Sequence, residues 1–399
     1  MVITMAPAMA WAGEGDPETP EAGSNTSAVT LNIADGSIKI TDTGYTQGEA
    51  ETETAWDTSN SSHELTISGT STANQIIVEG GNPVITLKDL TMSNVGVAID
   101  LKADAKICLQ GNNTLTPKEE YPGIYIAKDH TLTVAEESTG TLTIKTNKNT
   151  AGIGTSNSKG GYMAGGTVEI NGGTIMFKLG SKNNNGSSLG AGFNGSMEKV
   201  AINGGVVKFQ ENNEKAFYAI RAKEIEVTGG TVDGTKYGGG YGDTSCTVKV
   251  TGGNINSFSG EIAGRTRTEL YFVNKDGTPL ANTEVRVSES GTNTWKAHTN
   301  EKGVVTTYLA SGTKNITVSY GEATNETVTL ASDVHKYLIG GECTCDSIKG
   351  ITWNHGLPAS VNMYDAEDSI YTVANAVIET TEPCNMPIHP NLPGISYEL

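Results

Sequence analysis

Basic residues are scarce in this sequence, and arginine most of all. Of its 399 residues, 27 are Lys or Arg and 45 are Asp or Glu, which gives a formal net charge of −18 at pH 7. The arginines are Arg221, Arg265, Arg267 and Arg286. A surface that binds nucleic acid needs a basic patch, and anionic lipid attracts clusters of Lys and Arg. We therefore expect neither nucleic acid nor an anionic membrane surface as a partner.

Long hydrophobic runs are absent as well. No segment reaches the roughly 18 consecutive apolar residues of a membrane-spanning helix, so no membrane insertion is predicted. Residues 1–12 end in Ala10-Trp11-Ala12, which matches the small-x-small cleavage pattern of a secretory signal. We interpret residues 1–12 as a signal-peptide remnant and the Glu-, Pro- and Gly-rich residues 13–28 as a disordered linker. The predicted location is secreted or on the cell surface.

Cysteine is rare, with five residues in the chain. Cys108 and Cys246 fall in strand-like segments, where we expect them to act as small buried hydrophobic residues. Cys343, Cys345 and Cys384 are disulfide candidates, because an exported chain meets an oxidising environment. The odd number leaves one cysteine unpaired, and the spacing does not favour a four-ligand zinc site.

Glycine, by contrast, is abundant. The chain has 49 glycines, nearly double the usual share of about 7 %. Apolar residues make up 36 % and charged residues 18 %, and Thr, Asn and Ser are frequent. Such a composition favours strands and turns over helices, so the predicted fold class is all-β.

A repeat explains the glycines. Four segments of alternating apolar residues each end in a Gly-Gly pair followed by a further short strand: Val168–Ile175, Val200–Val207, Ile225–Val232 and Val248–Ile255. The pairs are spaced by 32, 25 and 23 residues, which is typical of a solenoid, and weaker copies extend the repeat from about residue 63 to 264. Two or three short strands per repeat, each burying one face against the next repeat, predict a right-handed parallel β-helix with an N-terminal cap over residues 29–266.

Aligning the Gly-Gly pairs also predicts which charged side chains are neighbours. It places Glu224 beside Lys199 and Glu226 beside Lys249 on adjacent strands, where ion pairs account for both carboxylates. The alternative is a calcium-dependent polysaccharide lyase, which needs acidic ligands and a basic residue close together. Its best candidates are Arg221 with Glu224, Glu226, Asp233 and Asp243. We expect no catalytic residue and no cofactor, with calcium only under the lyase alternative.

The pattern changes near residue 265, where glycine becomes sparse. Residues 267–331 contain strands at spacings typical of a small β-sandwich. The order Asp276-Gly277, Pro279-Leu280, Val285-x-Val287 and Thr299-Asn300-x-x-Gly303 resembles the prealbumin-like modules of Gram-positive surface proteins and the carboxypeptidase regulatory-like modules. Residues 332–399 suggest an immunoglobulin-like module that is truncated or atypical.

Exposed aromatic rings are the natural platforms for a sugar ring, which stacks on them while its hydroxyls meet polar side chains. The candidates lie in or beside predicted turns: Tyr162, Tyr237, Tyr241, Trp56, Tyr121 and Tyr125. The alternative is that each ring covers an end or corner of the solenoid. Trp56 in particular fits an N-terminal cap.

The repeat region as a whole resembles a family of exported proteins from gut Firmicutes that carry a carbohydrate-binding domain with a pectate-lyase-like β-helix. The resemblance covers roughly residues 30–264 and rests on Leu65–Gly69, Asn74–Gly81, Val84–Leu87, Gly111–Leu115, Ala151–Gly154 and Gly166–Gly173. It implies a surface-displayed protein that binds polysaccharide or host glycan, or an adhesin. We expect a monomer on a Gram-positive cell wall. A lyase on the same fold and a structural stalk that binds protein remain the alternatives.

Overall fold

The computed structural model describes one nearly continuous part of the chain. The described residues are 29–340 without 58–61, 148, 158–160, 181–185, 210–217, 234–236, 239–245, 257–260, 275–277, 290–292 and 331–335, together with 361–362 and 372–373. Within these ranges the one helix is a single 3₁₀ turn, η1 (Ile33–Asp35), and all other regular structure is β-strand. The all-β prediction is confirmed.

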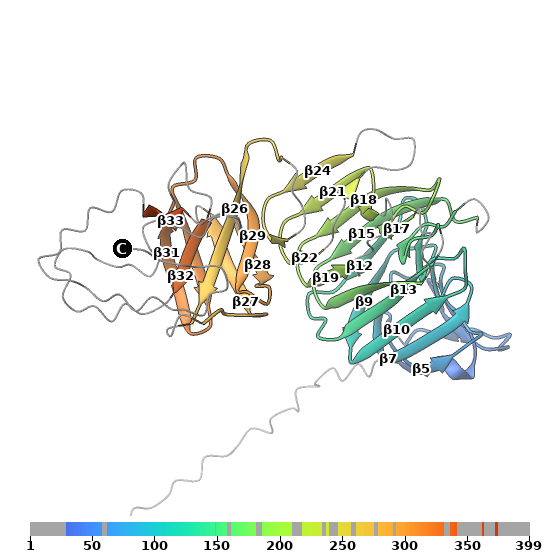
Figure 1. Cartoon of the computed structure of the whole chain (residues 1–399). Coiled ribbons are helices and arrows are strands. Elements are labelled where there is room, and N and C mark those ends of the chain that lie inside the picture. The colour runs from blue at the N-terminus through green and yellow to red at the C-terminus, as the bar shows by residue number, and fades with distance from the viewer. Residues whose placement is uncertain are drawn as a thin grey trace, which may run out of the picture.

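Residues 29–255 form two large sheets (Figure 1). The ten-stranded sheet has the spatial order β23 (Tyr237–Gly238), β20 (Tyr218–Arg221), β17 (Ser187–Gly190), β14 (Ile153–Gly154), β11 (Ile124–Ile126), β8 (Ile99–Leu101), β6 (Ile76–Val78), β2 (Ile38–Ile40), β3 (Gly44–Gln47) and β4 (Thr54–Ala55). Its strands are parallel except for β3 and β4, which form antiparallel pairs at one end.

The 15-stranded sheet extends in two directions from the long strand β7 (Val84–Val95). One arm contains β9 (Ala105–Gln110), β12 (Thr131–Val134), β15 (Ala164–Ile170), β18 (Ser196–Ile202), β21 (Glu224–Val227) and β24 (Thr247–Val250). The other contains β10 (Asn112–Pro117), β13 (Thr141–Thr146), β16 (Thr174–Leu179), β19 (Val206–Phe209), β22 (Thr231–Asp233) and β25 (Asn254–Ile255). Off this path, β5 (Glu64–Ser71) pairs with β7 and with β1 (Val29–Asn32).

The strands of the two large sheets pair at a constant interval along the chain. From β8 to β22, every strand pairs in parallel with the strand three places later in the chain. Each repeat therefore contributes one strand to the ten-stranded sheet and one to each arm of the 15-stranded sheet. The alignment of Gly-Gly pairs gives the correct register, because Ile170, Ile202, Val227 and Val250 are paired in series.

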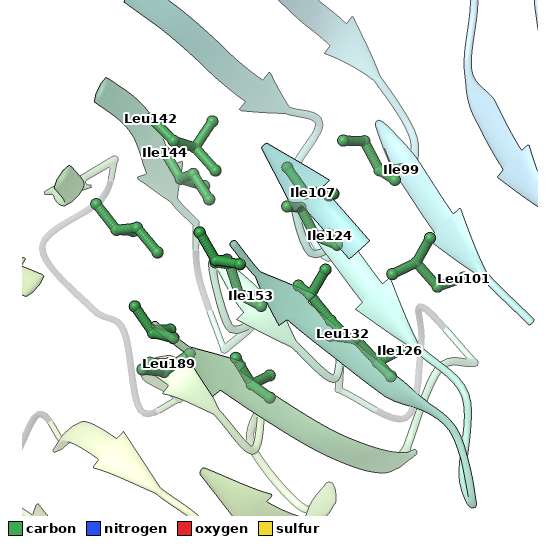
Figure 2. Packing of buried hydrophobic residues seen from close by; sticks show 14 of the residues in the cluster. Ile99, Leu101, Ile107, Ile124, Ile126, Leu132, Leu142, Ile144, Ile153 and Leu189 are labelled. Atoms are coloured by element: carbon green, nitrogen blue, oxygen red, sulfur yellow. The ribbon is translucent and has the colours of Figure 1, made fainter. Parts of the chain in front are cut away.

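The core of this region is a set of stacked aliphatic side chains. In the ten-stranded sheet Ile99, Ile124, Ile153 and Leu189 are register partners in turn, and each is at most 1 % exposed. Figure 2 shows these side chains among those of the facing strands, such as Leu132 and Leu142. Each strand is too short to bury a core alone, so burial depends on the repeats before and after it.

The second glycine of each Gly-Gly pair turns the chain at a stacked corner. Gly205 has φ +67°, which glycine adopts without strain. A Cβ built on Gly205 would lie 2.6 Å from the carbonyl oxygens of both Gly172 and Gly173 in the preceding repeat. These corners therefore require glycine both for the backbone conformation and for the close approach of the next repeat.

Residues 265–340 form a second region with its own core. Its three-stranded sheet contains β29 (Val304–Ala310), β26 (Arg265–Val273) and β32 (Lys336–Gly340), and its four-stranded sheet contains β28 (Asn293–His298), β27 (Glu284–Glu289), β30 (Asn315–Tyr320) and β31 (Ala323–Thr329). All pairs in these two sheets are antiparallel except β26 with β32. Side chains of both sheets share one hydrophobic cluster, which includes Phe272, Val287 and Ile339.

The two regions are joined by a polar junction at the last repeat. Asn254 is fully buried; its Nδ2 donates to the carbonyl of His298 (2.7 Å), and its Oδ1 accepts from the amide of Thr306 (2.8 Å). The amide of Gly230 donates to the carbonyl of Lys296 (2.6 Å), and Asn293 Nδ2 donates to the carbonyl of Thr251 (2.7 Å). The second region thus covers the end of the first through hydrogen bonds to its backbone.

Several predictions concern residues at or beyond the limits of the described ranges. Cys343, Cys345 and Cys384 lie outside the described residues, as do residues 1–28; a two-stranded pair, β33 (Val361–Asn362) with β34 (Thr372–Val373), is described within 341–399. Cys108 is buried as predicted. Cys246 directly precedes β24 and is half-buried rather than buried as predicted. No helix in the described ranges has the length and hydrophobicity that a membrane crossing requires.

Candidate functional site

Three of the six predicted aromatic residues come together on the outer side of the ten-stranded sheet. Ile124 and Ile126 of β11 are fully buried in the core, so Tyr125 between them points to the opposite face. The ring of Tyr162 lies 4.6 Å from that of Tyr125 at 61°, and 6.4 Å from that of Tyr121 at 63°. These edge-to-face contacts define a tyrosine cluster of Tyr121, Tyr125 and Tyr162, each of them half-buried.

The three rings are held in different ways. The hydroxyl of Tyr125 donates to the carbonyl of Ala164 (2.8 Å). Tyr162 is held through its backbone, which accepts from the amide of Ser156 (2.7 Å) and donates to the Ser156 hydroxyl (2.9 Å). Tyr121 lies against Gly96, its ring 3.8 Å from the position that a Cβ would occupy there. Among the described residues, none hydrogen-bonds the hydroxyl of Tyr121 or Tyr162, so these two phenols are available to a ligand.

A carboxylate lies beside the cluster on the same face. Asp100 of β8 is the register partner of Tyr125 on the neighbouring strand, and it is 6 % exposed. Its Oδ1 is covered and has no hydrogen-bond partner among the described residues. Burial raises the pKa of the Asp100 carboxyl, an effect that Lys102 opposes. Burial and the neighbouring Asp100 charge raise the pKa of both Tyr125 and Tyr162, which keeps the two phenols protonated and able to donate.

The charges around Asp100 are balanced. Lys102 Nζ lies 4.0 Å from Asp100 Oδ2 and 3.2 Å from Glu79 Oε1. Lys39 Nζ lies 2.7 Å from Glu79 Oε2, and its hydrogen bond is the main reason that the pKa of Glu79 is lowered. Two cations and two carboxylates therefore stand in a row at the edge of the tyrosine cluster.

Sequence reasoning missed Asp100, although a signal was present. The triplets Ile99-Asp100-Leu101 and Ile124-Tyr125-Ile126 have the same apolar-x-apolar form, and the structure pairs them residue by residue. Aligning these triplets, as the Gly-Gly pairs were aligned, would have placed Asp100 beside Tyr125. The position of Tyr162 has no such signal, because it lies in a connection between strands.

The other predicted aromatics lie elsewhere. The ring of Trp56 stacks on His63 (4.7 Å, 10°), its Nε1 donates to the carbonyl of Thr41 (3.1 Å), and it packs against the core near β3. Strands β8, β6 and β2 separate β3 from β11 in the sheet. Tyr237 belongs to β23, but its side chain is outside the described part of the structure, and Tyr241 lies outside the described residues altogether.

The carboxylates considered for a lyase are engaged in ion pairs. The predicted register of Lys199 with Glu224 and of Glu226 with Lys249 is confirmed. Lys199 Nζ lies 2.8 Å from Glu224 and 2.7 Å from Glu226, and Lys249 bonds the other oxygen of Glu226. These contacts lower the pKa of Glu226 and raise that of Lys199.

The basic residue considered for the same chemistry is covered. Arg221 is 2 % exposed, and its guanidinium carbon lies 5.8 Å from the centre of the Tyr218 ring. Asp233 is exposed, and Asp243 lies outside the described residues. Within the described ranges, no three His, Cys, Asp or Glu side chains come together as metal ligands would.

Comparison with known proteins adds no relative to this picture. No family model matches the chain, and neither a curated protein nor a solved structure does.

Proposed function

We propose that this chain is an exported cell-surface protein that binds polysaccharide or host glycan through the tyrosine cluster. The observation that carries the proposal is the convergence of Tyr121, Tyr125 and Tyr162, from a turn, a strand and a connection, on one face beside Asp100. Half-buried rings with available hydroxyls next to a carboxylate offer a sugar both an apolar face and polar partners. The signal-like residues 1–12 support export.

The scaffold proposed for this site is a right-handed parallel β-helix followed by a β-sandwich. The parallel pairing of each strand with the third strand after it supports the first part, and the two sheets around one core in residues 265–340 support the second. On such a scaffold, connections between strands lengthen without disturbing the stacked core, as the connection that carries Tyr162 illustrates.

The experiment is affinity electrophoresis of the full chain in native gels that contain plant, mucin or bacterial polysaccharides. We expect at least one polymer to retard the wild-type protein, and Tyr162→Ala to weaken that binding by about tenfold, since a stacked ring is lost. Tyr271→Ala, in the second region, is the matched control and should bind as wild type. Unchanged mobility in every polymer would refute the proposal.

The same gels separate the two alternatives. A lyase would release unsaturated products that absorb in the ultraviolet, and a chelator would abolish their formation. A protein-binding stalk would leave all polymers unbound, and its attachment to target cells would be lost after protease treatment of the cells.

A further inference from the structure

Asp100 is the feature of the site that the fold itself does not explain. Its side chain is 9 % exposed, and its Oδ1 is both covered and without a donor among the described residues. Covering a carboxylate oxygen without a hydrogen bond is unfavourable for folding. An apolar or small residue between Ile99 and Leu101 would serve the strand equally well, as Ile77 does at the paired position of β6.

The charges around Asp100 disfavour an anionic partner. Lys39 and Lys102 are neutralised by Glu79 and Asp100, so the site presents no excess positive charge. The whole chain carries a formal charge of −18, which repels a polyanion at long range. A carboxylate accepts hydrogen bonds and donates none, so its complement is a group with O–H or N–H donors.

We infer that the tyrosine cluster takes uncharged glycan units, whose adjacent ring hydroxyls donate to the Asp100 carboxylate while Tyr121 and Tyr162 contact the sugar face. This inference rests on the proposed glycan-binding function. Hydrogen bonds to a charged acceptor are stronger than those between neutral groups, so Asp100 supplies orientation and affinity that the rings alone lack. Tyr125, whose hydroxyl donates to the carbonyl of Ala164, supports the other two rings through its contact with Tyr162.

The three rings differ in their bonding. Tyr121 and Tyr162 have ring contacts but no hydroxyl partner among the described residues, so a sugar hydroxyl can bond these phenols without displacing a protein group. Tyr125 is the register partner of Asp100, so the carboxylate and the ring cluster lie on the same face of the sheet.

The test compares neutral and acidic polymers on the full chain. The probes are a neutral β-glucan, a neutral galactomannan and polygalacturonate, and the variants are Asp100→Asn, Tyr162→Ala and the control Asp129→Asn. Asp129 is an exposed carboxylate with φ +68°, a conformation that asparagine also adopts, so its replacement preserves the backbone.

We expect a neutral polymer to bind, Asp100→Asn to weaken that binding about tenfold or more, and Asp129→Asn to leave it unchanged. Thermal melting of Asp100→Asn at or above the wild-type temperature shows that the loss is not a loss of fold. Wild-type affinity in Asp100→Asn with lost affinity in Tyr162→Ala would overturn the role of Asp100 and leave glycan binding standing. Binding of polygalacturonate alone would overturn the uncharged class, and binding of no polymer would overturn the function as well.

Discussion

The two regions of this protein bury their cores by different means. In residues 29–255 each buried side chain lies next to its equivalent in the following repeat, as Ile170 lies next to Ile202. In residues 265–340 the neighbours are unrelated residues, since Val287 pairs with Trp295 on one side and Val318 on the other. The first arrangement can be extended by adding repeats, whereas the second closes on itself.

This difference has consequences for how each region tolerates change. In the stacked region, equivalent residues of successive repeats lie next to each other. An added side-chain atom at a stacked corner therefore presses on the backbone of the neighbouring repeat. The turn at Gly312 in the antiparallel region, by contrast, has open space around it. The predictions that follow use matched positions in the two regions, in order of decreasing effect.

The largest contrast is expected at two glycines with positive φ. Gly205→Ala forces a Cβ to within 2.6 Å of the carbonyl oxygens of Gly172 and Gly173, whereas Gly312, at φ +84°, has open space around it. We expect Gly205→Ala to lower the free energy of unfolding by about 3 kcal/mol, from strain and the backbone shift together. Gly312→Ala should cost about 1 kcal/mol, from strain alone. Urea denaturation measures the free energy of unfolding of both variants. Equal losses would show that the contact with the preceding repeat adds nothing to the cost of backbone strain.

The next largest loss of stability is expected at the junction between the two regions. Asn254→Ala leaves the amide of Thr306 without its side-chain partner in a buried interface and removes one of the two donors to the carbonyl of His298, which should cost about 2 kcal/mol. Because those groups join the two regions, we also expect their unfolding transitions to separate in calorimetry. Asn203→Ala removes an exposed amide that bonds only Asn171 and Thr228 within the first region, so it should leave the transitions coupled. Coupled unfolding in Asn254→Ala would contradict this role of the junction.

A smaller effect is expected at the ion pairs. Lys199→Met removes one cation from Glu224 and Glu226, but Glu226 keeps Lys249 and the group is partly solvated. The expected loss is about 0.5–1 kcal/mol, reduced by added salt. The pKa of Glu226 is lowered by folding, so this stabilisation is present at neutral pH and is lost as the pH falls through that pKa. Denaturation of wild type and variant at two pH values and two salt concentrations measures it.

The smallest effect on the free energy of unfolding is expected at Asp100, where the substitution stabilises the protein. Burial raises its pKa in the folded state, so the ionised form destabilises the fold at neutral pH, and protonation removes that cost as the pH falls through the raised pKa. Asp100→Asn should therefore be more stable than wild type at neutral pH, and the difference should shrink on acidification. The nearby Lys102, Glu79, Tyr125 and Tyr162 are present in both proteins, so the difference isolates Asp100. A difference in stability between the two proteins that grows on acidification would contradict the raised pKa of Asp100.

The register of the repeat region could be predicted because it is a local property. Equivalent residues in successive repeats must lie about 4.8 Å apart across paired strands, so aligning the repeats places side chains side by side. This correctly paired Lys199 with Glu224 and Ile202 with Val227. The same reasoning, applied to the triplets around Ile99 and Ile124, would have placed Asp100 next to Tyr125.

The candidate site could be predicted only in part, because its geometry is not a local property of the sequence. Tyr121, Tyr125 and Tyr162 were each proposed as single aromatics, and nothing in the spacing of the sequence indicates that they share one face. Tyr162 lies in the connection between β14 and β15, and the two hydrogen bonds between its backbone and Ser156 help to decide where its ring lies. Trp56, proposed with the same reasoning, lies beside β3 instead.

The sequence by itself determined the all-β class, the presence of a repeat of short strands and the neighbours along each stack, because alternation and period act between adjacent repeats. Only the tertiary structure decided that three tyrosines meet over Asp100, that Arg221 is covered, and that Asn254 joins the two regions. These features depend on the paths of connections and on contacts between residues far apart in the chain. Neither hydrophobic period nor local propensity specifies them.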